Sequence, residues 1–273
     1  MSTGLQRSQG KLKVGLARGQ DDATRVANLF QGGCLNARLP RPRHAGEADV
    51  VIINTAGGIT GGDHLSVDVT VGDGTRVTVT TPACERVYRS VEGEALIEQR
   101  VRVGRGARLD WVPQEVILYD RSRLRRRLDL QLEGGAEITM VEAVLLGRAA
   151  MGELVTGGSF YDFRTIRRDT CLIFADATRM ANAFGHARSC PSMLGDYAAM
   201  ANLVYIGPDL AAKRDALRAG FADCAHAQAG ASVIGEVLSA RIVATGGSAL
   251  RRVLMTALTV LRDARPLPRL WTC

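Results

Sequence analysis

Val101–Gln114 reads VRVGRGARLDWVPQ: alternating apolar positions lead into a turn at Gly104 and Gly106, and a second alternating stretch follows. Alternation of apolar and polar residues is typical of a half-buried strand, and glycine suits the turn between two strands. The same pattern stands on either side, as VTVGDGTRVTVTTP at Val69–Pro82 and LQLEGGAEITMVEA at Leu130–Ala143. We interpret each of the three segments as a β-hairpin.

The pattern repeats at a nearly constant interval. Its turn glycines recur at Gly74, Gly106 and Gly135, at intervals of 32 and 29 residues. A repeat of about this period indicates stacked sheets or a β-solenoid, in which each unit buries its apolar face on the next one. An ordinary β-sandwich, whose hairpins also look alike, is the alternative. In either case residues 45–180 are expected to be rich in strands.

The last third of the chain changes from alternation to helical spacing. Apolar side chains in Asp209–His226, and again in the stretch that follows Ser248, recur on one face of a helix. Ser248 is the expected N-cap of the second helix, and Pro266 and Pro268 are expected to stop it. Val237–Ala244, which lies between the two helices, fits a strand.

These patterns predict one mainly β domain over residues 1–273, with two stacked sheets in a solenoid-like arrangement and two C-terminal α-helices. The β-rich body is expected at about 45–180. The helix-containing part is expected at about 181–273.

Composition narrows the class of protein. The chain is 46% hydrophobic and 23% charged, which is typical of a soluble globular protein. Its uncharged stretch at Tyr197–Pro208 is far shorter than the roughly 20 apolar residues of a membrane span, and its N-terminus carries no apolar leader. We therefore expect a cytoplasmic protein without a membrane partner. Six scattered cysteines are expected to be reduced, and the spacing of cysteines and histidines does not fit a closed zinc site.

The net charge of +7 comes almost entirely from arginine, with one dense run at Arg121–Arg127. Leu124, Arg126 and Leu128 occupy alternate positions, so they would lie on one face of a strand. The residues between them, Arg125 and Arg127, are polar and would lie on the other face. That alternation fits a strand with one solvated face. A nucleic-acid module usually interleaves stacking aromatics with its basic residues, but aromatics make up only 5% of this chain. We therefore expect no nucleic-acid partner.

A glycine-rich loop, Gly57–Asp63, follows the apolar strand that begins at Val50. Such a loop can cradle a phosphate at the start of a helix. Here, however, an alternating strand follows, and the Lys-Ser/Thr pair of a phosphate loop is absent from the sequence. We interpret the loop as a structural one, in which glycines permit close backbone contact; a nucleotide-binding enzyme is the alternative function. The glycines concerned are Gly57, Gly58, Gly61 and Gly62.

Several carboxylates fall on strand faces that otherwise carry apolar residues. Asp63 would lie on the same strand face as the apolar residues Leu65 and Val67 that follow it. Glu142 stands at a position where the other two repeats carry neutral residues. Asp176 has a weaker claim of the same kind. A buried carboxylate needs a hydrogen-bond partner, a metal or a water-filled cavity. For Glu142, an internal ion pair, for instance with Arg148, and a functional role remain equal alternatives.

The residues form no catalytic set, since no serine or cysteine lies in a nucleophile motif beside a histidine. We therefore expect a protein that is not an enzyme. Five blocks of the sequence, taken in order, resemble the UreD (UreH) family of urease accessory proteins. They are NTAGGITGGD (Asn54–Asp63), TTPACERVYRS (Thr80–Ser90), WVPQEVILYD (Trp111–Asp120), VEAVLLGRAAMGE (Val141–Glu153) and LPRLW (Leu267–Trp271).

The resemblance implies a non-enzymatic scaffold or chaperone with stacked β-sheets and added helices. It also implies that the protein acts with UreF and the GTPase UreG, docks on apo-urease and assists the delivery of nickel to the urease active site. No permanently bound cofactor is implied, only nickel in transit. Carried over by position, the carboxylates of the metal passage are Asp63, Glu85, Glu142 and Asp176.

The two expected C-terminal helices suggest a partner surface. Their apolar stripes lie beside arginines that we expect to be exposed and to offer a rim to UreF, because interfaces favour arginine around an apolar centre. Packing of the helices within the monomer explains the stripes equally well. The arginines are Arg214, Arg218, Arg251 and Arg252.

Overall fold

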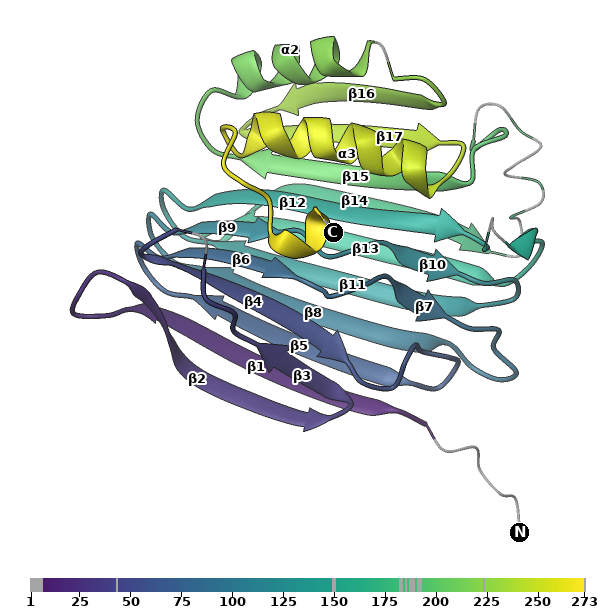
Figure 1. Cartoon of the computed structure of the whole chain (residues 1–273), viewed down its shortest axis with the longest axis horizontal. Coiled ribbons are helices and arrows are strands. Elements are labelled where there is room, and N and C mark those ends of the chain that lie inside the picture. The colour runs from purple at the N-terminus through teal and green to yellow at the C-terminus, as the bar shows by residue number, and fades with distance from the viewer. Residues whose placement is uncertain are drawn as a thin grey trace.

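The computed structural model describes residues 7–42, 44–148, 151–181, 184, 186, 190, 193–222 and 224–272. Within these residues the strands form two sheets that stack on each other, with two helices at one end (Figure 1). Sheet A has the order β14-β13-β11-β8-β5-β1-β2. Its strands are β1 (Gln9–Arg18), β2 (Thr24–Gly33), β5 (His64–Val71), β8 (Ala95–Val103), β11 (Arg123–Leu132), β13 (Ser159–Arg168) and β14 (Cys171–Ala181).

Sheet B has the order β16-β17-β15-β12-β9-β6-β4-β3; a short strand, β10, also pairs with β12, and another, β7, pairs with β10. A large apolar core fills the space between sheets A and B. The strands of sheet B are β3 (Leu35–Arg38), β4 (Glu47–Asn54), β6 (Arg76–Thr80), β7 (Glu85–Val87), β9 (Arg108–Trp111), β10 (Val116–Leu118), β12 (Glu137–Leu146), β15 (Ala199–Ile206), β16 (Ala227–Ile234) and β17 (Val237–Ala244).

The three repeated segments are not hairpins, so that interpretation was wrong. In each repeat the first strand belongs to sheet A and the second to sheet B: β5 then β6, β8 then β9, and β11 then β12. Successive repeats pair in parallel, β5 with β8 and β8 with β11 in one sheet, β6 with β9 and β9 with β12 in the other. The solenoid-like arrangement is confirmed. The hairpin interpretation failed because alternation shows that a strand has one buried face but does not show which strand it pairs with.

The turn glycines stack along the edge where the chain passes from sheet A to sheet B. Gly74, Gly106 and Gly135 have φ of 64°, 61° and 72°, a left-handed conformation that glycine adopts without steric cost. The amide of Gly74 donates to the Arg105 carbonyl at 2.9 Å, and that of Gly106 donates to the Gly134 carbonyl at 3.2 Å. Each turn therefore supports the next one.

The C-terminal part forms the two predicted helices, α2 (Leu210–Phe221) and α3 (Gly247–Leu261), and a strand at Val237–Ala244. The helices cover one face of β15, β16 and β17, where a second apolar core lies (Figure 1). Ser248 is not the N-cap of α3: the cap position is Gly246, and no side chain caps the helix there. Pro268 precedes a short 3₁₀ helix, η2 (Arg269–Trp271).

Strands also precede residue 45. β1 lies in parallel beside β5 and antiparallel beside β2, so β structure begins at Gln9. At the other end of the stack, β12, β15, β17 and β16 pair antiparallel. None of the helices that the structure describes has the length and apolar character needed to cross a membrane.

Candidate functional site

Sheet B is interrupted in two successive repeats, at corresponding positions along their strands, and a proline explains each interruption. The first repeat has Pro82 after β6, the second has Pro113 after β9, and in both the strand resumes a few residues later, as β7 and β10. Proline has no amide hydrogen and so cannot donate to a neighbouring strand. The third repeat has no proline at this level, and β12 runs on without a break through Glu142.

A cavity of about 270 Å³, which we call the central pocket, lies against this break. Its walls come from both sheets, so it reaches from the surface into the space between them. Apolar residues and glycines make up a little more than half of the lining, and polar or charged residues make up the rest. The polar or charged side chains of the lining are Asn54, Thr80, Thr81, Cys84, Glu85, Arg86, Gln99, Gln114 and Arg126.

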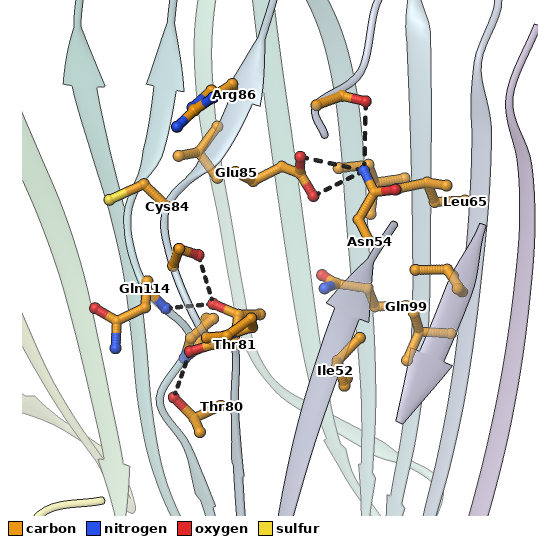
Figure 2. A pocket seen from close by; sticks show the side chains of 18 of the residues that line it. Ile52, Asn54, Leu65, Thr80, Thr81, Cys84, Glu85, Arg86, Gln99 and Gln114 are labelled. Carbon is orange, nitrogen blue, oxygen red and sulfur yellow. Dashed lines mark hydrogen bonds between the residues drawn. The ribbon is translucent and has the colours of Figure 1, made fainter. Parts of the chain in front are cut away.

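Glu85 and Asn54 point toward each other across this pocket (Figure 2). The Asn54 amide Nδ2 donates to both carboxylate oxygens of Glu85, at 3.2 Å each. Burial raises the pKa of Glu85 above its ordinary value, and the hydrogen bond from Asn54 only partly opposes this. Burial likewise raises the pKa of the Cys84 thiol, to about 11, so this cysteine is a protonated thiol at neutral pH.

Glu142 lies deeper and forms an internal ion pair, which was one of the two alternatives left open by the sequence, but with a different arginine. Its carboxylate pairs with the guanidinium of Arg126, and its Oε1 accepts a hydrogen bond of 2.9 Å from the Trp111 indole. Arg148, the partner suggested from the sequence, pairs instead with Glu153 at 2.9 Å. The Glu142 side chain is only 2% exposed, and burial raises its pKa although the Arg126 charge opposes the shift.

Arg126 is also bound to a second buried carboxylate, Asp162. Arg126 Nε and Nη2 donate to the two oxygens of Asp162, at 2.9 Å and 2.7 Å. Burial alone would raise the pKa of Asp162, but the charges of Arg126 and Arg164 and the two hydrogen bonds outweigh it and hold the pKa below its ordinary value. A fork of two parallel bonds to a carboxylate is the strongest geometry available to arginine.

The pairing continues from Asp162 to the surface. Arg164 lies 3.2 Å from Asp162 and donates to Asp176 at 2.9 Å, and Asp176 also pairs with the exposed Arg241. With its amide oxygen oriented toward the guanidinium, Asn202 accepts from Arg164 at 3.0 Å. We call this series of alternating charges between the two sheets the charge chain. Its members, in order, are Glu142, Arg126, Asp162, Arg164, Asp176 and Arg241.

The structure thus brings Glu142 and Asp176 into one network and places Glu85 in the pocket that Arg126 also lines. Arg126, Asp162 and Arg164 were missed as members of this network. The signal was present, because Arg126 shares the parity of the buried leucines of β11, and Asp162 and Arg164 share that of buried residues of β13. Parity finds such residues, but it does not identify their partners on other strands.

Asp63 has a different environment. It is 4% exposed, yet it precedes β5 rather than belonging to it. Its two carboxylate oxygens accept from the Ser8 amide at 2.7 Å and from the Thr60 amide at 2.8 Å. These contacts favour a structural role, in which Asp63 fastens the glycine loop to the beginning of β1.

The glycine loop is in close contact with neighbouring segments. The amides of Ile59 and Gly62 donate to backbone carbonyls of neighbouring segments, at 2.8 Å and 2.9 Å. A side chain at Gly58 would meet the Tyr88 ring, and one at Gly61 would meet Ser90. Because these amides already have partners, they are not free to hold a phosphate.

The arginines of the helices differ in exposure. Arg251 is not a free surface residue, which corrects the expectation: its guanidinium lies 3.9 Å from the centre of the Trp271 ring and donates to Gln114 at 2.8 Å. Arg218 is exposed but donates to the Ala231 carbonyl at 2.9 Å, and Arg214 is half-buried beside Asp215. Arg252 is exposed.

The contacts of Arg251 fasten the C-terminal segment LPRLW to the outer side of the sheet B break. The Trp271 indole donates to the Val112 carbonyl at 2.9 Å, and the Gln114 amide donates to the Leu270 carbonyl at 3.1 Å. The last residues of the chain therefore support the wall of the central pocket.

No group of three or more His, Cys, Asp or Glu side chains arranged to hold a metal ion occurs among the residues that the structure describes. The carboxylates of the charge chain face guanidinium groups instead. The arrangement can stabilise charge inside the molecule and hold a polar route between the sheets.

The chain matches the family model described as UreD urease accessory protein over residues 8–272. The urease accessory protein UreD of Rhizobium etli is 42% identical over 270 residues, which cover 99% of this chain and 97% of the relative. Those of Chelativorans sp. and Xanthobacter autotrophicus are each 43% identical, over 268 and 266 residues that cover 98% and 97% of this chain and 95% and 90% of the relatives.

These relatives are named as accessory proteins of an enzyme and not as the enzyme, in agreement with the prediction of a non-enzymatic protein. The match extends from β1 to the C-terminal segment, so it covers both sheets, both helices and the charge chain. It confirms the resemblance that the five sequence blocks indicated. The chain belongs to the UreD family of urease accessory proteins.

Proposed function

We propose that this protein is a scaffold of urease maturation that, with UreF and the GTPase UreG, docks on apo-urease in the cytoplasm and passes nickel toward the urease active site. Membership of the UreD family supports the link to urease. The observation that carries the nickel part is that Glu85 and Arg126 line the same pocket, and that Arg126 belongs to the charge chain inside an otherwise apolar core.

A site that passes a metal ion on must bind it more weakly than a site that stores it. Carboxylate and amide oxygens suit divalent cations, and a cation in transit must be bound weakly enough to leave again. Glu85, Glu142 and Asp176 each lie beside a group that competes for the carboxylate: Asn54 for the first, arginines for the others. Such competition favours weak and transient binding, so nickel is here a cargo and not a resident cofactor.

Co-purification tests the partners. The full chain, carrying an affinity tag, is expressed together with apo-urease and UreF, and the eluted proteins are identified. We expect both proteins to elute with the chain in fixed ratio and to remain bound at moderate salt. Elution of the chain without either protein would contradict the proposed function. Binding of GTP by the purified chain without UreG would favour the nucleotide-binding alternative.

Glu142→Gln tests the passage. Glutamine keeps the size of the side chain and can still accept from Trp111, while Arg126 keeps both bonds to Asp162, so we expect the variant to fold. Because it lacks the negative charge, it should activate urease less well at limiting nickel, by roughly tenfold if Glu142 is a direct ligand. The measurement is urease activity after reconstitution at several nickel concentrations.

The control for this experiment is Glu133→Gln, which removes an exposed carboxylate in the turn between β11 and β12. This variant should activate urease as well as the parent does. Equal activation by Glu142→Gln and the parent at the lowest nickel concentration would make Glu142 a core residue only. A variant that does not fold would show that the ion pair is structural.

Arg252→Glu tests the helix surface as a UreF contact. Arg252 is the informative position because it is exposed, whereas Arg251 holds the C-terminal segment. Reversal of a charge at the rim of an interface is expected to slow association and to weaken binding several-fold. The affinity for UreF is measured at two salt concentrations, and unchanged affinity at both would remove this surface from the interface.

A further inference from the structure

The charge chain places a guanidinium between two buried carboxylates. Arg126 lies between two carboxylates, Glu142 from sheet B and Asp162 from sheet A, and is only 4% exposed. Its charge neutralises the oxygen ligands that a divalent cation would use. While Arg126 occupies this position, a second cation meets electrostatic repulsion.

Arg126 has room to leave this position. Its side chain lines the central pocket, whose volume is about 270 Å³. A cavity needs roughly 10–15 Å³ to hold one water molecule, so the pocket accommodates a guanidinium together with water. Arg164, the next arginine of the chain, does not line this pocket and is held by Asp162 and Asp176.

Two oxygens near Arg126 have unused acceptor capacity. Glu142 Oε2 is in ionic contact with Arg126 but receives no well-directed hydrogen bond from any described residue. Gln99, on β8, also lines the pocket, and its buried Oε1 has no donor within the part of the chain that the structure describes. Oxygens that lack donors are the groups that a cation would satisfy.

We propose that Arg126 is a movable internal counter-cation: it fills a divalent-cation seat formed by Glu142 and Asp162, and the seat opens to nickel when the guanidinium turns into the central pocket. This inference rests on the proposed nickel passage and names the residue that controls it. The apparent affinity of a site falls in proportion to the fraction of molecules in which it is free. Arg126 therefore keeps the resting protein from retaining nickel.

Nickel titration of the full chain tests the proposal. The parent and Arg126→Gln are titrated with Ni²⁺ by calorimetry, and Arg126→Gln/Glu142→Gln shows how much of the binding depends on Glu142. If the seat is free in less than about 10% of parent molecules, Arg126→Gln should bind nickel at least about tenfold more tightly. The gain should disappear in the double variant. Arg127→Gln, a neighbour on the outer face of β11, should bind like the parent.

Equal nickel affinity of the parent and Arg126→Gln would overturn the proposal, as would a gain that persists in the double variant. If Arg126→Gln does not fold, Arg126→Lys takes its place: an ammonium keeps the charge but cannot bind both carboxylates as a planar fork does. A smaller, Glu142-dependent gain is then expected, and no gain contradicts the proposal. If Arg126→Gln gains nickel binding but Glu142→Gln does not change the activation of urease, the cation seat exists but is not part of a nickel passage.

Discussion

Asp162→Ala should lower the free energy of unfolding by about 3–5 kcal/mol, since removal of one partner leaves buried charges uncompensated. Asp162 joins two guanidiniums, Arg126 and Arg164, and both are almost completely buried. Without it, Arg126 retains only Glu142 and Arg164 retains only Asp176 among the carboxylates of the charge chain. The measurement is urea unfolding of the purified chain, followed by circular dichroism.

The matched control is Asp68→Ala on strand β5 of the same sheet, whose carboxylate pairs with the exposed Arg100 at 3.8 Å. A pair of this kind contributes at most about 1 kcal/mol. Acid should narrow the difference between parent and Asp162→Ala. Because folding lowers the pKa of Asp162, its contribution is complete above the unfolded pKa of about 3.9 and is lost as the pH falls through the folded value. Equal stability of the two variants at pH 7 would contradict the assigned role of the charge chain.

Gly61→Ala should destabilise the protein by about 3 kcal/mol or more, the upper range for overpacking. A Cβ at Gly61 would lie 1.9 Å from Ser90 Oγ and 2.2 Å from the Glu92 carbonyl oxygen. Ser90 itself donates to the Glu92 and Gly93 carbonyls, so the methyl group would push apart a segment that is already hydrogen-bonded. A loss of roughly 10 °C in Tm is expected, at about 2–4 °C per kcal/mol for a domain of this size.

Gly57→Ala, in the same loop, separates packing from backbone conformation. Gly57 has a φ of 75°, and no atom lies within 4 Å of the place that a Cβ would take, so alanine there should cost only about 1 kcal/mol for the left-handed conformation. A loss at Gly61 no larger than the loss at Gly57 would mean that the loop can move away from Ser90. The structural role of the glycines would then be overstated.

Much of the fold follows from patterns that the chain repeats. Alternation placed the strands of the three repeats, and helical spacing placed α2 and α3. The parallel pairing was not accessible from alternation, since a hairpin and a turn between two sheets both need a glycine such as Gly106 between two amphipathic strands. Residues that pair in sheet A are about one repeat apart in sequence, as Val101 and Leu130 are.

The candidate site was predictable residue by residue but not as a network. Parity indicated that Glu142 is buried, and the same rule applied to Asp162 would have indicated a second buried charge. The pairing of each carboxylate with its arginine depends on the stacking of two sheets, which sequence spacing does not encode. Arg148 is near Glu142 in sequence, whereas Arg126, its true partner, faces it from the other sheet.

The open edge of strand β2 affects whether the protein stays monomeric in solution when no partner is bound. Within the described residues it pairs only with β1, and its Val26, Leu29 and Phe30 are 38%, 40% and 52% exposed. Val26 and Leu29 lie opposite the buried Leu16 and Val14, but β3 on the other sheet is too short to cover them. An open strand edge with apolar side chains favours pairing between copies. This edge therefore favours self-association, and a partner that covers it would raise the concentration at which the protein stays monomeric.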